Sequence, residues 1–542
     1  MGGVYLLTLS RNHSETEDSL VFSIRVEGGS AADLFEPHHL IYDWAGRLVY
    51  EASRSIGIAE DPVIVLQAFD AVLGAVVVGL LWLTLRWAGL SRLVAFTATG
   101  LLASSYGFWR NSVEVEVYAL AALALVIMLA AALRAADRAD ARSFALLGVC
   151  HGAAVLAHFT SVLLAGMVIA ALVLARRRAH AELMPMLGAY AATASGVLIA
   201  GYAVAIAFVG IDSPGAFDEW FRASGDAEQY GNASPTALVE GVIGAGRAFL
   251  GAHFLLSFQD VQALLVERFP QTPLREERFM VADFDATLAL VLAGATIAAI
   301  LLLAVAALRW LRRPALPPAA GRLAILCLAW VIPVTALTAY WDPLNIELWY
   351  SSWIPAFILL ALPLASAQAR PRSATALSIG LVGLVFLVNL LGSQLPQRDE
   401  KRDYWQARSA WYAASTGPGD LIVANGYLQV AYLQYLTGAR VVDAAQTLAG
   451  ADSSDALAEL LRSPRRTTGA VYVTQEAFYP FEDAPGGCTG APDVCVAGER
   501  ARSALLECAV RVPVPGPEPV WTLHGAPSGG GRGGGQQPGC SP

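Results

Sequence analysis

Acidic side chains gather in a polar segment near the start of the chain, residues 10–60. This segment contains two adjacent carboxylates, Glu17 and Asp18, and further along a pair of imidazoles, His38 and His39. A positioned carboxylate can take the proton of an acceptor hydroxyl group, or it can hold a metal ion. A solvated acidic loop without chemistry has the same composition, so the residues alone leave both interpretations open.

A second group of charged and aromatic residues lies between Phe108 and Tyr118, where the sequence reads FWRNSVEVEVY. Arg110 can bind a phosphate group through its forked donors, and Glu116 can orient the guanidinium. A neutralising salt bridge with no role in substrate binding explains the same pair equally well.

A third group occurs in the stretch WDPLNIELWY, which contains Trp341, Asn345 and Glu347. Sugar sites combine aromatic faces, on which the sugar stacks, with amides and carboxylates that bind hydroxyl groups. Aromatic anchoring at a membrane interface uses the same residue types. The choice between these interpretations depends on where the fold places the three groups.

The scaffold predicted by the composition is a membrane protein. The 542 residues are 56% hydrophobic and 15% charged, with a mean hydropathy of +0.51, whereas soluble proteins carry about a quarter charged residues. Apolar blocks of about 20 residues can cross the hydrocarbon core as helices, and they lack the alternation of a β-barrel. We expect an all-α polytopic fold of about 10–11 transmembrane helices. The expected spans are 62–86, 92–109, 117–134, 143–158, 160–175, 183–209, 284–309, 323–340, 350–368 and 374–392.

Arginines mark every second short loop, which predicts that these loops face the cytoplasm. The arginines are Arg86, Arg92, Arg134, Arg138, Arg142, Arg176, Arg177, Arg178, Arg309, Arg312, Arg313, Arg322, Arg370 and Arg372. All three groups of candidate residues then lie on the outer side, as do residues 210–283 and the chain after about 393. Within 210–283, the semi-apolar piece 240–258 suits a re-entrant or interfacial helix; an ordinary extra span is the alternative.

The C-terminal part has a different composition and predicts a small extracytoplasmic α/β domain. Short apolar stretches at 419–425, 438–443 and 470–474 read as strands, with a helical stretch between the first two. We place a transmembrane domain at 1–392, the α/β domain at 393–524 and a disordered Gly/Pro-rich tail at 525–542. Disulfides are expected in an exported domain with four cysteines, and pairing among Cys488, Cys495, Cys508 and Cys540 stays open.

The motif Phe108-Trp109-Arg110 followed by Glu116-Val117-Tyr118-Ala119-Leu120 resembles the signature of a bacterial membrane family. This family is related to protein O-mannosyltransferases and belongs to the GT-C glycosyltransferase superfamily. The stretch from Glu36 to Tyr42 is a degenerate counterpart of the family's His-Pro segment, and Trp341 to Glu347 is similar to an element of related members.

The resemblance implies a membrane glycosyltransferase of the bacterial cytoplasmic membrane, acting at its outer face. The donor would be a polyprenyl-phosphate sugar, and the acceptor a hydroxyl group of a protein or a cell-envelope glycan. Asp18 takes the role of catalytic base, with Glu17 second. The substrate-binding residues would be Arg110, Glu116, Tyr118, His38, His39, Trp341, Asn345 and Glu347. No cofactor is assigned with certainty, although a divalent cation is compatible with the site; membrane lipid is a further partner and nucleic acid is not.

Two other classes of protein remain open. A catalytically inactive assembly or partner-binding protein would keep the fold and tolerate loss of Asp18. A transporter or flippase would carry ionisable residues within its spans, of which Asp70 is the main example, and pseudo-symmetric halves, which the sequence does not show.

Overall fold

The computed structural model describes residues 1–16, 18–58, 61–179, 182–223, 235–268, 274–311, 315–366, 371–443, 469–478, 509–512 and 520–523. The chain divides into two compact units. The first comprises Met1–Ser10, Phe22–Leu255 and Phe284–Arg398, and the second comprises Arg11–Val21, Leu256–Asp283 and Asp399–Pro542.

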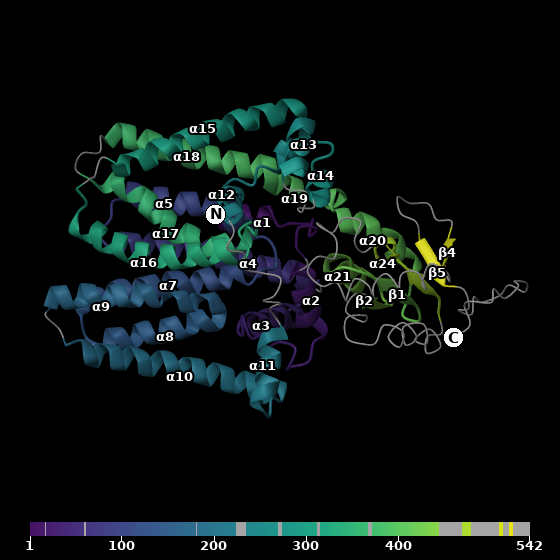
Figure 1. Ribbon diagram of the computed structural model, residues 1–542, viewed down its shortest axis with the longest axis horizontal. Helices are drawn as coiled ribbons and strands as arrows, with labels where there is room; N and C mark the ends of the chain where they lie inside the picture. The colour runs from purple at the N-terminus through teal and green to yellow at the C-terminus, as the bar shows by residue number, and fades with distance from the viewer. Residues whose placement is uncertain are drawn as a thin grey trace, which may run out of the picture. The chain divides into compact units, whose positions relative to one another are not determined.

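Long apolar helices build the first unit (Figure 1). Within the described ranges, eight helical stretches are long and apolar enough to cross a membrane: Pro62–Trp87, Tyr118–Arg138, Phe159–Arg178, Leu183–Val209, Ala286–Trp310, Pro318–Trp341, Glu347–Ala365 and Arg372–Gln397. Two shorter apolar helices, Arg92–Ser104 and Ala141–Ala157, correspond to two further expected spans. The predicted all-α polytopic membrane fold is confirmed.

The elements of the first unit follow the expected spans closely. They include α4 (Pro62–Trp87), α5 (Arg92–Ser104), α6 (Tyr106–Arg110), α7 (Tyr118–Arg138), α8 (Ala141–Ala157), η1 (Phe159–Leu164), α9 (Ala165–Ala179), α10 (Leu183–Val209), α15 (Ala286–Leu311), α16 (Pro318–Trp341), η3 (Glu347–Trp349), α17 (Tyr350–Ala361), η4 (Leu362–Ala365), α18 (Pro371–Asn389), η5 (Leu390–Gln394) and α19 (Leu395–Gln397). Helix α8 packs against both α7 and α10, and α5 packs against both α17 and α18 (Figure 1).

Local sequence signals explain where several of these helices begin and end. Asp61 caps α4 by accepting a hydrogen bond from the N–H of Val63 at 2.9 Å, and Pro62 occupies the first turn. Asp140 caps α8 in the same way through the N–H of Ser143. The chain turns at His158, as expected, because α8 ends there and η1 follows.

The polar segment 10–60 is more ordered than the predicted loop. It forms α2 (Asp18–Gly28) and α3 (Tyr42–Ser55), and the six-residue helix α1 (Gly2–Leu7) precedes it. In α3 the buried residues Tyr42, Gly46 and Tyr50 recur every four positions, which is the spacing of one helical face. The sequence of this polar segment therefore already contained the helical spacing.

Residues 210–283 contain no membrane-spanning helix in their described part. They form α11 (Pro214–Ala223), α12 (Pro235–Phe249), η2 (His253–Ser257), α13 (Gln259–Arg268) and α14 (Arg275–Met280). Helix α12 covers most of the piece predicted to be re-entrant or interfacial. It packs on α6, α16 and η3 within the first unit.

A small mixed sheet forms the core of the second unit. The strands are β1 (Leu421–Ala424), β2 (Arg440–Asp443), β3 (Val471–Val473), β4 (Ala509–Val512) and β5 (Val520–Leu523), in the order β2-β1-β3-β5-β4. Strand β1 pairs in parallel with β2 and β3, whereas β5 pairs antiparallel with β3 and β4. The second unit also contains α13 and α14 and the helices η6 (Glu400–Arg402), α20 (Tyr404–Ser415), α21 (Tyr427–Leu436) and α24 (Gln475–Phe478).

The three predicted strands correspond to β1, β2 and β3, and the expected helical stretch corresponds to α21. The small C-terminal α/β fold is therefore confirmed, although β4 and β5 were not predicted. Residues 525–542 and the cysteines Cys488, Cys495, Cys508 and Cys540 lie outside the described residues.

Candidate functional site

The connection between α6 and α7 is short, charged and buried. Arg110 is 1% exposed and Glu116 is fully buried, in a segment that the sequence predicted to cross an outer loop. Trp109 helps to fix it, because its ring stacks on Phe386 and its indole N–H donates to the hydroxyl group of Thr8 at 2.9 Å. Charged groups buried at this level require partners.

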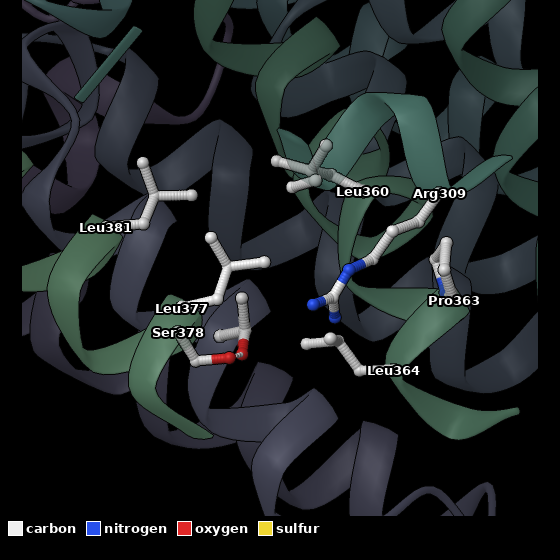
Figure 2. A pocket seen from close by; sticks show the side chains of 9 residues that line it. Arg309, Leu360, Pro363, Leu364, Leu377, Ser378 and Leu381 are labelled. Carbon is white, nitrogen blue, oxygen red and sulfur yellow. Dashed lines mark hydrogen bonds between the residues drawn. The ribbon is translucent and has the colours of Figure 1, made fainter. Parts of the chain in front are cut away.

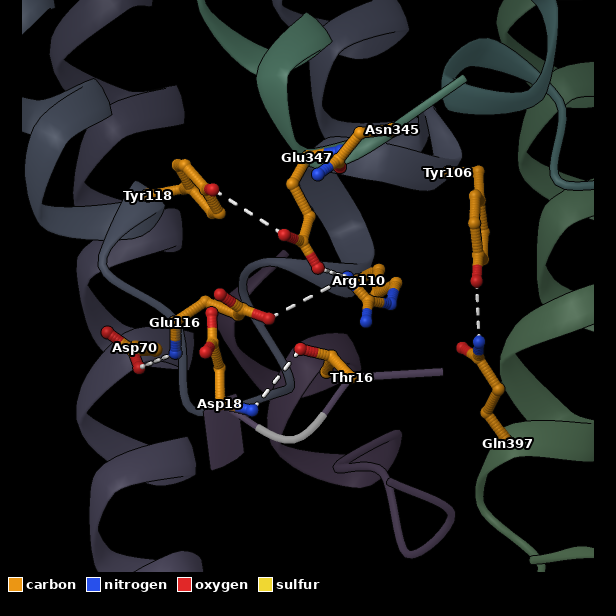
Figure 3. Close-up of polar contacts among 10 residues, drawn as sticks. All are labelled: Thr16, Asp18, Asp70, Tyr106, Arg110, Glu116, Tyr118, Asn345, Glu347 and Gln397. Atoms are coloured by element: carbon orange, nitrogen blue, oxygen red, sulfur yellow. Dashed lines mark hydrogen bonds and ion pairs between the residues drawn. The ribbon is translucent and has the colours of Figure 1, made fainter. Parts of the chain in front are cut away.

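Arg110 lies between two carboxylates from different parts of the chain (Figure 3). Its Nη1 donates to Oε1 of Glu347 at 2.9 Å and lies 3.7 Å from Oε1 of Glu116. Glu347 begins η3, in the connection between α16 and α17. The second and third groups of candidate residues therefore meet at one guanidinium.

Aromatic and amide groups surround Glu347. The hydroxyl group of Tyr118 donates to its Oε2 at 3.5 Å, and the side-chain oxygen of Asn345 accepts from its backbone N–H at 2.9 Å. The ring of Tyr118 lies 4.9 Å from that of Tyr350 and 5.5 Å from that of His158, measured between centroids. Arg110 and Tyr118 thus each bind one oxygen of the Glu347 carboxylate, and Asn345 binds the backbone of the same residue.

Asp70 supports this group from within α4. It is fully buried, and its Oδ2 accepts hydrogen bonds from the hydroxyl group of Tyr42 at 2.6 Å and from the backbone N–H of Glu116 at 3.2 Å. Asp70 therefore fixes the position of the Glu116 backbone. Sequence reasoning noted Asp70 only as an acid within a span; the cost of burying it was the available signal that it has structural partners.

A separate polar group lies between α2 and α3. Arg25 Nη1 is 3.7 Å from a carboxylate oxygen of Glu36 and 3.6 Å from one of Asp43. Burial raises the pKa of Asp43 to about 7, with the Glu36 charge adding to the rise and Arg25 opposing it. Beside this group, burial lowers the pKa of His39 well below its usual value, and the charges of His158 and Arg25 add to that effect.

The predicted histidines both contact aromatic rings. The His38 ring contacts those of Phe159 and Phe221, and the His39 ring meets Phe22 edge to face. Trp341 is the last residue of α16 and takes no part in the hydrogen bonds and ion pairs named above.

Asp18, the predicted base, is the first residue of α2 and belongs to the second unit. Its side chain is half-buried, and its backbone N–H donates to the hydroxyl group of Thr16 at 3.3 Å (Figure 3). Glu17 lies outside the described residues.

The charges around Arg110 suit a polar ligand. One guanidinium shared by two carboxylates leaves an excess of negative charge when both acids are ionised, and a bound cation would balance it. Carboxylate oxygens such as those of Glu116 and Glu347 are suitable ligands for a divalent cation. The guanidinium itself is the group in this cluster able to pair with a phosphate.

Comparisons with known proteins agree with this architecture. Residues 60–182 match the family model of the N-terminal domain of the protein O-mannosyl-transferase TMEM260. This range contains Arg110, Glu116 and Tyr118, so the predicted resemblance is confirmed there. No curated protein matches the chain.

The crystal structure of ArnT from Cupriavidus metallidurans bound to undecaprenyl phosphate is similar in fold, with a TM-score of 0.54 and 12% identity, covering 96% of each chain. At this identity the likeness shows that the two chains share a fold. ArnT from the same organism in the apo state has a TM-score of 0.46 and 14% identity, covering 88% of this chain and 92% of that one.

Proposed function

We propose that this chain is a membrane glycosyltransferase that moves a sugar from a polyprenyl-phosphate donor to a hydroxyl acceptor. The observation that carries the proposal is the cluster of the buried residues Arg110 and Glu116 with Glu347, of which the first two lie within the range similar to a protein O-mannosyltransferase domain. The fold shared with ArnT, solved with a polyprenyl phosphate, supports the choice of donor.

In the proposed reaction, the carboxylate of Asp18 takes the proton of the acceptor hydroxyl group. The acceptor oxygen then bonds to the anomeric carbon of the sugar, while the bond from that carbon to the phosphate oxygen breaks and leaves its electron pair on the lipid phosphate. Arg110 pairs with the charge that develops on this phosphate. A divalent cation held by Glu116 and Glu347 would supply further neutralisation of charge.

The acceptor is a protein or a cell-envelope glycan, and transfer takes place on the outer face of the bacterial cytoplasmic membrane, where we also place the α/β domain. Positive charge in alternate loops supports this orientation. Asp70 was the main acid within a span and the main argument for a transporter. Its contacts with Tyr42 and Glu116 give it a structural role instead.

The proposal is tested by transfer of radiolabelled sugar from a panel of polyprenyl-phosphate donors, in membranes that contain equal amounts of each variant. We expect Asp18→Asn to lose activity by at least about 100-fold, as removal of a general base does. The matched control is Asp33→Asn, an exposed acid of the same segment whose carboxylate accepts hydrogen bonds from the backbone N–H and the hydroxyl group of Ser30. Equal activity of the wild type and Asp18→Asn would remove Asp18 from the mechanism.

The role of Arg110 has its own test in the same assay. Arg110→Lys keeps the charge and loses the forked geometry, so we expect a higher KM for the donor and a lower kcat. If the wild type is inactive with every donor, the interpretation as an inactive partner-binding protein takes the place of the enzyme.

A further inference from the structure

A narrow pocket opens among four helices of the first unit, and none of the residues of the Arg110 group lines it. It is lined by α5, α15, the α17–η4 segment and α18, and it contains about 280 Å³ of space, including its open mouth. Leucine is the commonest residue of its walls, with Leu360, Leu364 and Leu377 among them. One charged side chain, Arg309, belongs to this lining (Figure 2).

The guanidinium of Arg309 points into the pocket between these leucines (Figure 2). Its side chain is half-buried, and no hydrogen bond or ion pair of this group occurs among the residues that the structure describes. The two hydroxyl groups of the pocket have partners other than Arg309: Thr97 donates to Ser378 at 2.9 Å, and Ser378 donates to the carbonyl group of Ala374. A guanidinium between apolar walls is unfavourable until an anion pairs with it.

The surrounding sequence supplies positive charge and no acid. Residues 309–322 contain four arginines, and residues 361–373 contain two; neither stretch has an Asp or Glu. These stretches lie on the side predicted to face the cytoplasm. The negatively charged lipids of that leaflet attract basic groups close to the membrane.

We propose that this pocket binds the phosphate of an anionic membrane phospholipid. Arg309 pairs with the phosphate, and the leucine side chains contact the first part of the acyl chains. The pocket is far too small to enclose a whole small molecule, so only the phosphate would meet Arg309 at its open mouth, and the rest of the lipid would stay in the bilayer. Because the pocket involves none of the residues proposed for catalysis, this site is independent of the proposed reaction.

The test is native mass spectrometry of the full-length protein, purified in detergent and titrated with phosphatidylglycerol, with phosphatidylcholine or with inorganic phosphate. We expect the wild type to bind phosphatidylglycerol in preference to phosphatidylcholine, and Arg309→Gln to bind it about fivefold more weakly. Arg92→Gln is the matched control: it removes the same charge from an exposed residue on the same predicted side, and its binding should equal that of the wild type.

Equal binding by the wild type and Arg309→Gln would overturn the proposal, leaving Arg309 as a charge that only offsets the C-terminal dipole of α15. Equal competition by inorganic phosphate would also overturn it, since the apolar walls would then contribute nothing. If Arg309→Gln fails to fold, the test uses the binding of phosphatidylglycerol by Arg309→Lys and the preference of the wild type for phosphatidylglycerol over phosphatidylcholine. If the wild type binds phosphatidylcholine as tightly as phosphatidylglycerol, that result alone contradicts the proposed site.

Discussion

At the scale of single residues, Asp70 shows how a buried acid can be explained by what it holds. Removing its carboxylate in Asp70→Ala would leave the Tyr42 hydroxyl group and the Glu116 N–H without their acceptor, at a cost of about 1–3 kcal/mol for each buried group. We expect a lower unfolding temperature in detergent and weaker sugar transfer. Asp70→Asn keeps an acceptor oxygen and should lie close to the wild type in both measurements. Equal losses in Asp70→Asn and Asp70→Ala would contradict the positioning role.

Asp43 is predicted to make stability depend on pH. Its folded pKa of about 7 lies above the usual value of 3.8 because the side chain is buried. Between these values the folded protein holds a proton that the unfolded chain has released, so stability falls as the pH rises from about 4 to 7 and then stays level. The difference corresponds to roughly 4 kcal/mol.

The measurement is the unfolding temperature of the wild type and Asp43→Asn from pH 4 to 9. The amide cannot ionise, so the variant should lose this decline and should exceed the wild type in stability above pH 7. Parallel curves for the two proteins would show that Asp43 does not titrate in this range. Glu51→Gln, an exposed acid on the same helix, serves as the control.

At the scale of elements, the packing of α12 on the connection that carries Glu347 depends on one glycine. A Cβ atom at Gly244 would lie 1.9 Å from the carbonyl oxygen of Pro343 and 2.9 Å from Nε1 of Trp349. Gly244→Ala therefore forces α12 away from this connection, at a cost of about 1–3 kcal/mol. We expect a lower unfolding temperature and reduced sugar transfer, because η3 and Glu347 would shift when α12 no longer packs on them.

Gly246→Ala is the matched control for this prediction. A Cβ atom at Gly246 meets nothing within 4 Å, and alanine is favoured over glycine in a helix by up to about 1 kcal/mol. This variant should be as stable as the wild type or slightly more stable. A similar loss in both variants would mean that the helix, rather than the contact with Pro343, is sensitive to substitution.

The helices and strands could largely be predicted from the sequence, whereas the contacts between them could not. Ten spans and three strands follow from hydropathy and from apolar runs between turns, which are local signals. The contact of Asp70 with Glu116, and of Arg110 with Glu347, joins residues far apart in the chain, and no local pattern encodes it. Strands β4 and β5 escaped prediction because Val512 and Val520 border proline-rich sequence that is typical of loops.

At the scale of the whole molecule, the ends of three helices are held together by charge at the side predicted to be cytoplasmic. Asp137 in the last turn of α7 lies 2.5 Å from Arg178 and 3.4 Å from Arg322, between the nearest side-chain atoms. Three connections that the sequence places on one side therefore lie at the same end of the helices, in agreement with the alternation of arginine-rich loops. The charge pattern then predicts which side of the membrane this is.

We expect residue 92 to be cytoplasmic and residue 31 to face outward, because only Arg92 lies within the arginine-rich set. The measurement uses Arg92→Cys and Ala31→Cys, both at exposed positions, in a variant without the native cysteines. A membrane-impermeant maleimide applied to intact spheroplasts should label Ala31→Cys, and it should label Arg92→Cys only after permeabilisation. The opposite pattern would invert the topology, placing the Arg110 group on the cytoplasmic side, where no outer-face transfer could take place.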